Sequence, residues 1–181
     1  MCIRDSLSVH LDGSRLACAA AATGAGVEEL TRGADVISLG ATKNGALGAE
    51  AVVVRNPEAV SGIQYLNKSL LQLPSKARFI SAQLLALFDG DLWLRNAEHA
   101  NAQAAKLAKG LIDAGFDVPV TTQANAVIAS VEPEIVERVL AQGVIFYAWP
   151  FVENGIRLMT AWDTPDSAID ELISTFVAAR G

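Results

Sequence analysis

The stretch VISLGATKNGALGAEAVVV, residues 36–54, consists of two apolar and partly β-branched runs on either side of a short polar turn. Asn44 and Gly45 both accept the positive φ of a tight hairpin turn, so the pattern predicts two antiparallel strands with Lys43 near the tip. A lysine in that place is ordinarily solvated. The Gly- and Ala-rich surroundings of Lys43 fit burial, or a ligand lying close to the backbone. The residues alone leave both interpretations open.

The second interpretation has a chemical consequence. Removal of a lysine from water disfavours its charged form, and the neutral amine is the nucleophile of Schiff-base chemistry. Thr42 beside it offers a hydroxyl to an anionic group. Lys43 and Thr42 are therefore the first candidate site residues.

The segments on both sides of this hairpin alternate between strand and helix patterns. Residues 7–11 predict a short strand, and the DGSR sequence that follows predicts a turn and the N-cap of an alanine-rich helix that Gly24 ends. A helical region is expected after Asn56-Pro57 up to about residue 73, and a second helix over residues 74–88. A long helix is expected over residues 91–114, since apolar side chains recur there at steps of three and four: Trp93, Ala97, Ala100, Ala104, Leu107 and Leu111.

From residue 117 the order of elements becomes strand, helix, strand, strand, helix, with the second of these strands expected over residues 144–151. Pro133 is expected in the first turn of the middle helix, and Thr164 as the N-cap of the last one. We therefore expect an α/β chain with four parts: a non-native leader (1–6), part of a larger α/β domain (7–88), a connecting helix (89–116) and a small α+β domain (117–181).

Composition excludes several classes of function. The chain has 181 residues, 51% of them hydrophobic, and a net charge of −6, which argues against nucleic-acid and anionic-membrane partners because both need a basic face. No apolar run reaches the roughly 18 residues of a membrane span. The two cysteines, Cys2 and Cys18, lack the spacing of a metal site or a disulfide framework, so we expect no metal and a reducing, cytoplasmic setting.

Two further positions carry charges where the pattern does not require them. Asp12 stands between a strand and a helix: it either caps the helix or points into a cleft at the carboxyl end of the strand, with Arg15 three residues later. Arg157 interrupts an apolar strand pattern, and it either faces solvent or binds a carboxylate through two parallel hydrogen bonds. His10, His99 and the Cys18 thiol are weaker candidates, expected to be packed, solvated and inert, respectively.

These segments carry a family resemblance. HLDGSRL (10–16) and SLGATKNGALGAEAVVV (38–54) resemble two segments of the threonine aldolase group, also called the β-eliminating lyase family, among the fold-type I pyridoxal-phosphate enzymes; PSKARFISAQ and ANAVIASV resemble later ones. The resemblance covers the chain from about Val9. It implies the C-terminal portion of the fold-type I architecture, namely part of the large cofactor-binding domain and the small C-terminal domain.

The resemblance also implies roles and a reaction. Lys43 would form the Schiff base with pyridoxal 5'-phosphate, Asp12 would pair with the protonated pyridine nitrogen, and Thr42 would help to bind the phosphate. Arg157 would hold the substrate carboxylate, with Arg15 as a second donor. The reaction would be retro-aldol cleavage of threonine or allo-threonine to glycine and an aldehyde, in a cytoplasmic homo-dimer or homo-tetramer.

Two alternatives to that reaction stay open. The same Asp and Lys serve β-elimination or transamination, and a non-catalytic α/β fragment would use Lys43 only as a turn residue. Family members begin with about half a chain more, which holds the residue that stacks on the cofactor ring and most of the phosphate site. The 181-residue chain is therefore expected to bind the cofactor poorly by itself and to be a weak or inactive aldolase.

Overall fold

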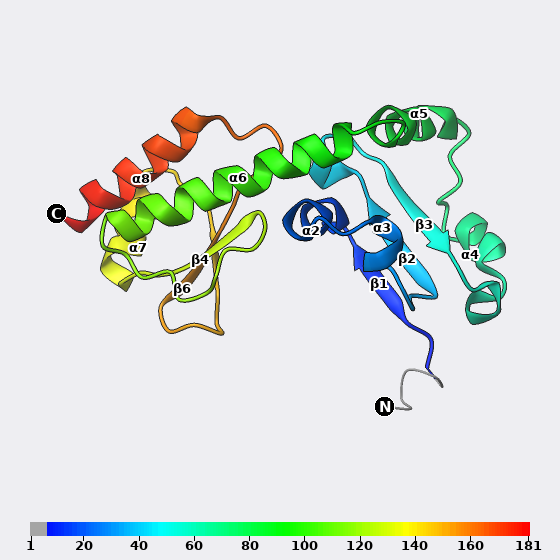
Figure 1. The fold of residues 1–181 in the computed structure, drawn as a ribbon, viewed down its shortest axis with the longest axis horizontal. Helices are drawn as coiled ribbons and strands as arrows, with labels where there is room; N and C mark the ends of the chain where they lie inside the picture. The colour runs from blue at the N-terminus through cyan, green and yellow to red at the C-terminus, as the bar shows by residue number, and fades with distance from the viewer. Residues whose placement is uncertain (1–6) are drawn as a thin grey trace. The chain divides into compact units, whose positions relative to one another are not determined.

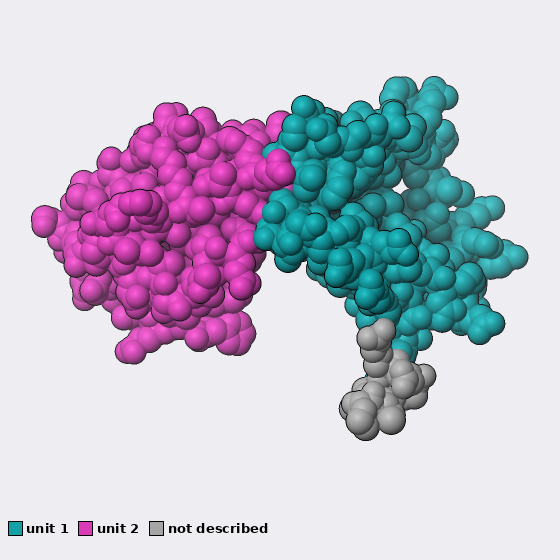
Figure 2. All heavy atoms as spheres, viewed as in Figure 1, with its two compact units in different colours: residues 1–95 teal, residues 96–181 magenta. Residues whose placement is uncertain are grey.

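The protein divides into two compact units, coloured separately in Figure 2. The computed structural model describes residues 7–181, so the predicted leader at residues 1–6 lies outside the described residues. The units are Met1–Arg95 and Asn96–Gly181, and their boundary falls inside the long helix. The predicted domain boundaries at residues 88 and 116, on either side of the connecting helix, stay a prediction.

Unit 1 contains a three-stranded sheet in the order β1-β2-β3 (Figure 1). β1 and β2 are parallel, and β2 and β3 form an antiparallel hairpin. In chain order its elements are β1 (His10–Gly13), α2 (Leu16–Thr23), α3 (Val27–Leu30), β2 (Val36–Gly40), the 3-10 turn η1 (Thr42–Asn44), β3 (Glu50–Val54), the 3-10 turn η2 (Pro57–Val60), α4 (Ile63–Ser69) and α5 (Ala77–Phe88).

The start of unit 1 differs from the sequence-based expectation. The first strand begins at His10 rather than at residue 7 and continues through Asp12 to Gly13. Arg15 occupies the N-cap position of α2 and makes no side-chain cap bond, so Asp12 is not the helix cap. Gly24 ends α2 in the left-handed conformation, with φ 69°, as predicted.

The predicted hairpin is confirmed, but its connection is longer than a two-residue turn. Residues 41–49 join β2 to β3, and only Gly45 among the expected Asn-Gly pair has a positive φ, 115°. Asn44 is instead the buried last residue of the η1 turn. The longer connection places Lys43 in the middle of a one-turn helix.

The two faces of this sheet differ in composition. Asp12 pairs in register with Ser38, so both side chains point to one face, which His10 shares because it lies two residues before Asp12. Ile37 alternates to the other face and is buried. The face that carries Asp12 is the open one, because His10 and Asp12 are exposed.

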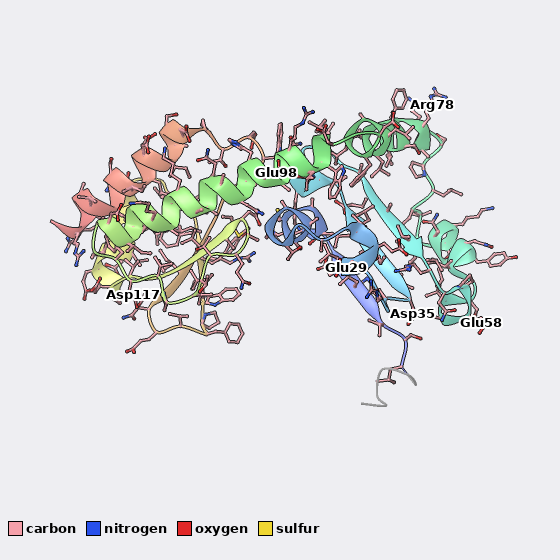
Figure 3. All side chains as sticks on the ribbon, viewed as in Figure 1. Glu29, Asp35, Glu58, Arg78, Glu98 and Asp117 are labelled. Carbon is pink, nitrogen blue, oxygen red and sulfur yellow. The ribbon has the colours of Figure 1, made fainter. Side chains whose placement is uncertain are left out.

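A carboxylate holds the three strands together at the end opposite to Asp12. Asp35, labelled in Figure 3, accepts hydrogen bonds from the Val9 backbone N–H at 2.7 Å and from the Asn56 amide at 2.9 Å. The first of these bonds and then the second hold the pKa of Asp35 below its ordinary value. Since Val9 precedes β1 and Asn56 follows β3, one ionised side chain links the whole sheet at this end.

Helix α5 covers the connection that carries Lys43. Ala41 and Ala49, at the two ends of that connection, are buried together with Leu87 of α5. Phe88 and Trp93 pack against the same cluster, with their ring centroids 6.1 Å apart. Small residues at positions 41 and 49 allow this close approach.

Unit 2 packs three helices on one side of an antiparallel sheet in the order β4-β6-β5. Figure 1 shows α6 and α8 side by side, and an added Cβ at Gly110 of α6 would lie 2.2 Å from the Cδ1 atom of Ile173 in α8. The elements are α6 (Leu92–Asp113), which begins in unit 1, β4 (Ala126–Ser130), α7 (Pro133–Ala141), β5 (Tyr147–Ala148), β6 (Gly155–Met159) and α8 (Asp166–Arg180). The predicted inner face of the long helix is confirmed from Ala97 onward: Ala97, Ala100, Ala104, Leu107 and Leu111 are all buried.

Two details of unit 2 were predicted wrongly. The strand expected over residues 144–151 is reduced to Tyr147–Ala148. Thr164 does not cap α8: its hydroxyl oxygen accepts from the Ala161 backbone N–H at 2.8 Å and closes the preceding turn, while Pro165 holds the N-cap position.

Across residues 7–181, every helix is too short or too polar to pass through a bilayer. In the same part of the chain, no group of three or more His, Cys, Asp or Glu side chains is arranged to hold a metal ion.

Candidate active site

Asp12 lies at the carboxyl end of β1, where its carboxylate is held by the turn that follows. The Ser14 backbone N–H donates to the Oδ1 atom of Asp12 at 3.0 Å. This bond, then the Ser14 side chain, and then the positive charges of Lys43 and His10 lower the pKa of Asp12 against the opposing effect of desolvation. Asp12 is therefore an exposed carboxylate that stays ionised, and the positive charge of Lys43 adds to its stabilisation.

Lys43 stands on a turn that is fixed from both sides. Asn44 next to it is buried and donates from its side-chain amide to the carbonyl oxygen of Trp93 at 2.8 Å. The Ala41 carbonyl accepts from the backbone N–H groups of Asn44 at 2.9 Å and Ala46 at 3.2 Å. Lys43 itself is exposed. A fixed backbone with an exposed amine suits a reactive lysine better than a mobile hairpin tip does, because its position relative to Asp12 is set in advance.

Thr42 and Arg15 complete the predicted group in unit 1. The hydroxyl oxygen of Thr42 accepts from the Ala49 backbone N–H at 3.3 Å, which closes the connection and leaves the hydroxyl hydrogen as a donor. The Nε atom of Arg15 is out of contact with solvent and has no hydrogen-bond partner among the described residues. Thr42 thus has a donor to offer to an anion, whereas the Nε–H of Arg15 is a buried donor without an acceptor.

The open face of the sheet adds a polar pair that the sequence analysis did not assign. The Nε2 atom of His10 and the hydroxyl of Ser38 lie 2.8 Å apart, beside Asp12. The face continues into a groove of about 690 Å³ between β3 and α4, with Glu50 and Asn67 among its polar lining residues. Strand alternation could have indicated that His10 shares a face with Asp12, whereas only the pairing register brings in Ser38.

Ser14 is a further residue that sequence reasoning missed. Its backbone N–H is the main support of the Asp12 carboxylate. The signal was available, since an Asp side chain commonly accepts from the backbone two residues later in a turn.

Arg157 lies in unit 2, on β6, in register with Tyr147 on one side and Ile128 on the other. Its guanidinium carbon is 5.7 Å from the centre of the Trp149 ring. Arg157 belongs to a different unit from Asp12 and Lys43, and the grouping of the three residues stays a prediction.

The weaker candidates have structural roles. The Nε2 atom of exposed His99 is 2.8 Å from the carbonyl oxygen of Thr164 and ties α6 to the segment before α8. Cys18 is buried as expected, and desolvation raises the pKa of its thiol, so this thiol is unreactive.

The match to one family model defines the class of protein. The family model for beta-eliminating lyases matches residues 1–134, and the chain belongs to this family. This confirms the resemblance found in the sequence. The architecture is the mixed α/β fold of the fold-type I pyridoxal-phosphate enzymes, as predicted.

Curated relatives point to one group within the family. The chain is 35% identical to the low specificity L-threonine aldolase of Pseudomonas aeruginosa, over 94% of this chain and 50% of that protein. It is 34% identical to the enzyme of the same name from another Pseudomonas strain, with the same coverage. The chain thus spans about half the length of the curated relatives it matches.

Solved structures agree on the fold. A Leishmania major threonine aldolase superimposes with a TM-score of 0.86 at 24% identity, over 99% of this chain and 54% of that one. A structure described as SPT with PLP gives a TM-score of 0.59 at 17% identity, over 95% of this chain and 46% of that one.

Proposed function

We propose that this chain carries the lysine side of a pyridoxal 5'-phosphate site in a carbon–carbon lyase that cleaves threonine or allo-threonine to glycine and an aldehyde. One observation carries the proposal: Lys43, on a fixed turn just after β2, and the exposed Asp12 carboxylate, on the parallel neighbour β1, lie at the same end of the sheet. The threonine aldolase names of the two curated relatives support the choice of reaction.

The side chains of unit 1 fit this cofactor. A carboxylate kept ionised by the Ser14 N–H is the acceptor that a protonated ring nitrogen needs, and Arg15 Nε is a donor without an acceptor. Lys43 would hold the cofactor through its amine, and Thr42 would donate its hydroxyl to the phosphate. When bound, the cofactor supplies an electron sink for bond cleavage at the substrate Cα.

The other residues would bind and orient the substrate. Arg157 would hold the α-carboxylate through its planar guanidinium, which can donate two parallel hydrogen bonds to one carboxylate. Arg15 would be a second donor to an anionic group. The role of Asp12 is to remain charged: its lowered pKa keeps it an acceptor throughout the neutral range.

Reductive labelling tests the assignment of Lys43. The chain has five lysines: Lys43, Lys68, Lys76, Lys106 and Lys109. Borohydride converts a lysine–aldehyde linkage into a stable secondary amine, so peptide mapping after treatment with pyridoxal phosphate and borohydride gives the fraction of label at each position. We expect Lys43 to take more label than any other lysine, and Asp12→Asn to reduce that preference.

Matched variants make the result specific. Lys68→Arg, at an exposed lysine in the last turn of α4, should leave the labelling of Lys43 unchanged, whereas Lys43→Arg should leave only weak and evenly distributed label. Equal labelling of all five lysines would contradict the proposal and favour the non-catalytic interpretation, in which Lys43 is only a turn residue.

The reaction itself is tested by its products. Acetaldehyde and glycine from threonine would support retro-aldol cleavage, whereas pyruvate from serine would indicate β-elimination. The aldolase is favoured here because both curated relatives are named for that activity.

We also propose a homo-oligomer, a dimer or tetramer, in the cytoplasm. The oligomer is supported by exposed apolar side chains on and after α4, including Leu66, Leu70 and Leu71 at 55%, 65% and 88% exposure. The compartment is supported by cysteine usage, since the two cysteines of the sequence lack the spacing of a disulfide framework, which suits a reducing environment. Sedimentation equilibrium tests the first point, and fractionation of the source cells tests the second.

A further inference from the structure

Arg157 projects from the sheet of unit 2 on the face opposite to the main core. Its neighbours along β6, Ile156 and Leu158, alternate to the other face and belong to the buried cluster under the helices. Tyr147 stands opposite Arg157 on β5 and is 72% exposed. The guanidinium is therefore part of a partly open, aromatic surface.

Trp149 is the residue that contacts this guanidinium. The register continues from Tyr147↔Arg157 and Ala148↔Ile156 to Trp149, whose backbone N–H donates to the carbonyl of Gly155 at 2.7 Å. Trp149 and Arg157 are consequently diagonal neighbours on one face, a spacing that long and aromatic side chains can bridge. The 5.7 Å between the guanidinium carbon and the ring centre is a cation–π distance.

The Trp149 ring is held in place by the turn that follows it. The Val152 N–H donates to the Trp149 carbonyl at 3.2 Å, and the Gly155 N–H donates to the Val152 carbonyl at 3.0 Å. A Cβ at Gly155 would lie 2.4 Å from the Trp149 carbonyl oxygen, so this closed turn requires glycine there. The Phe151 ring meets the Trp149 ring edge-on, at 5.4 Å between centroids.

A second arginine in unit 2 shows what is unusual about Arg157. Arg180 also lies over an aromatic ring, that of Phe116 at 5.1 Å, but its Nη1 atom donates to the Ala114 carbonyl at 2.9 Å. Arg157 donates no hydrogen bond and pairs with no carboxylate anywhere in residues 7–181. Trp149 thus fixes the guanidinium while leaving its N–H donors free.

We propose that Trp149 is a positioning residue for Arg157, which it holds by stacking so that the guanidinium N–H groups remain available to the carboxylate of an amino-acid substrate. This inference rests on the proposed function, because it takes Arg157 as the carboxylate-binding residue. Trp149 itself would act through Arg157.

The test follows the guanidinium directly in the full 181-residue chain, without cofactor. Arginine Nε–Hε signals are recorded by NMR during titration with glycine and, as the control without a carboxylate, glycinamide. Loss of one signal in Arg157→Gln identifies Arg157. We expect glycine but not glycinamide to shift it, while the signal of Arg180, which already has an acceptor, stays in place.

Two kinds of substitution at Trp149 separate stacking from simple filling of space. Trp149→Phe keeps an aromatic face and should retain most of the glycine response. Trp149→Leu removes that face and should weaken apparent glycine binding at Arg157 roughly two- to fivefold, the range expected for one partly exposed cation–π contact. Trp149→Met provides the same comparison if the Arg180 signal reveals that the leucine variant is not folded.

The outcomes distinguish this inference from the proposed function. If the leucine or methionine variant binds glycine at Arg157 as tightly as the original chain does, the positioning role of Trp149 is wrong and the proposed function is untouched. If the Arg157 signal of the original chain ignores glycine, the assignment of Arg157 as the carboxylate-binding residue fails, and this inference fails with it.

Discussion

Replacement of Gly40 by alanine tests whether close packing at the strand ends holds Asp12 in place. Gly40 is the last residue of β2, and an added Cβ would lie 2.8 Å from the Oε2 atom of Glu50 and 2.9 Å from the Cα atom of Ser14. The Glu50 carboxylate can swing away. Ser14 cannot, because the contacting atom is backbone and the Ser14 N–H supports the Asp12 carboxylate.

The expected cost is that of overpacking a site whose neighbour must move, about 1–3 kcal/mol in the free energy of unfolding. Gly48 in the same hairpin is the matched control. A Cβ there would meet nothing within 4 Å, and its φ lies outside the left-handed region. Gly48→Ala should be neutral or stabilise by up to ~1 kcal/mol, since alanine restricts the unfolded chain.

The assay follows thermal unfolding by the fluorescence of Trp93, which packs against the core of this hairpin. Phenylalanine at positions 149 and 162 removes the two other tryptophans of the sequence. For a domain of 60–100 residues, each kcal/mol corresponds to roughly 4–8 °C in Tm. Gly40→Ala should therefore melt at least ~4 °C below Gly48→Ala and should show less selective labelling of Lys43.

Two results would refute this reasoning. Equal melting temperatures for the two alanine variants would mean that the Ser14 backbone yields without cost. A destabilised Gly40→Ala with undiminished selectivity at Lys43 would mean that the bond from Ser14 to Asp12 does not position the site.

Three further predictions concern single contacts. Asn44→Ala should lower the free energy of unfolding of unit 1 by about 1–3 kcal/mol, because it removes the 2.8 Å hydrogen bond from the Asn44 amide to the Trp93 carbonyl oxygen. Unfolding followed by Trp93 fluorescence measures this loss. The pKa of Asp35 in the folded protein lies below its ordinary value of 3.8. The ionised carboxylate therefore contributes its full stabilisation above pH 3.8, and this stabilisation is lost as the pH falls through the lower pKa of the folded state. Asp35→Asn should make Tm less dependent on pH in this acid range. Leu111→Ala, at 0% exposure in the core of unit 2, should cost about 2–5 kcal/mol in chemical denaturation, against well under 1 kcal/mol for Ile112→Ala at 55% exposure.

Much of the secondary structure could be predicted because local pattern and burial agree. The long helix has apolar residues at steps of three and four, and its predicted inner face is the buried one from Ala97 to Leu111. Gly24 ends α2 because only glycine adopts the left-handed conformation there at no steric cost. The failures lie at element ends: Thr164 reads as a cap, but its hydroxyl closes the preceding turn.

The candidate site divides in the same way. The sequence singled out Lys43, Asp12 and Arg157 because each places a charge where the apolar pattern does not need one, and the family resemblance assigned them chemistry. The sequence did not predict that Asp12 lies within a strand, because that depends on pairing with the distant strand β2. Nor did it predict that Asn44 is buried, because that depends on the carbonyl of Trp93, far away along the chain.

What the sequence determined by itself is the order of helices and strands, the hairpin around Lys43 and membership of a family, since all three depend on local residue patterns. Only the tertiary structure decided which neighbours each charge has. The Ser14 backbone N–H donates to Asp12 within a turn, and Lys43 follows the strand next to that of Asp12 and lowers its pKa. Trp149 contacts Arg157 as a diagonal neighbour on two paired strands. The physical reason is that such contacts depend on strand register and backbone closure, and a shift of one residue would move each side chain to the opposite face.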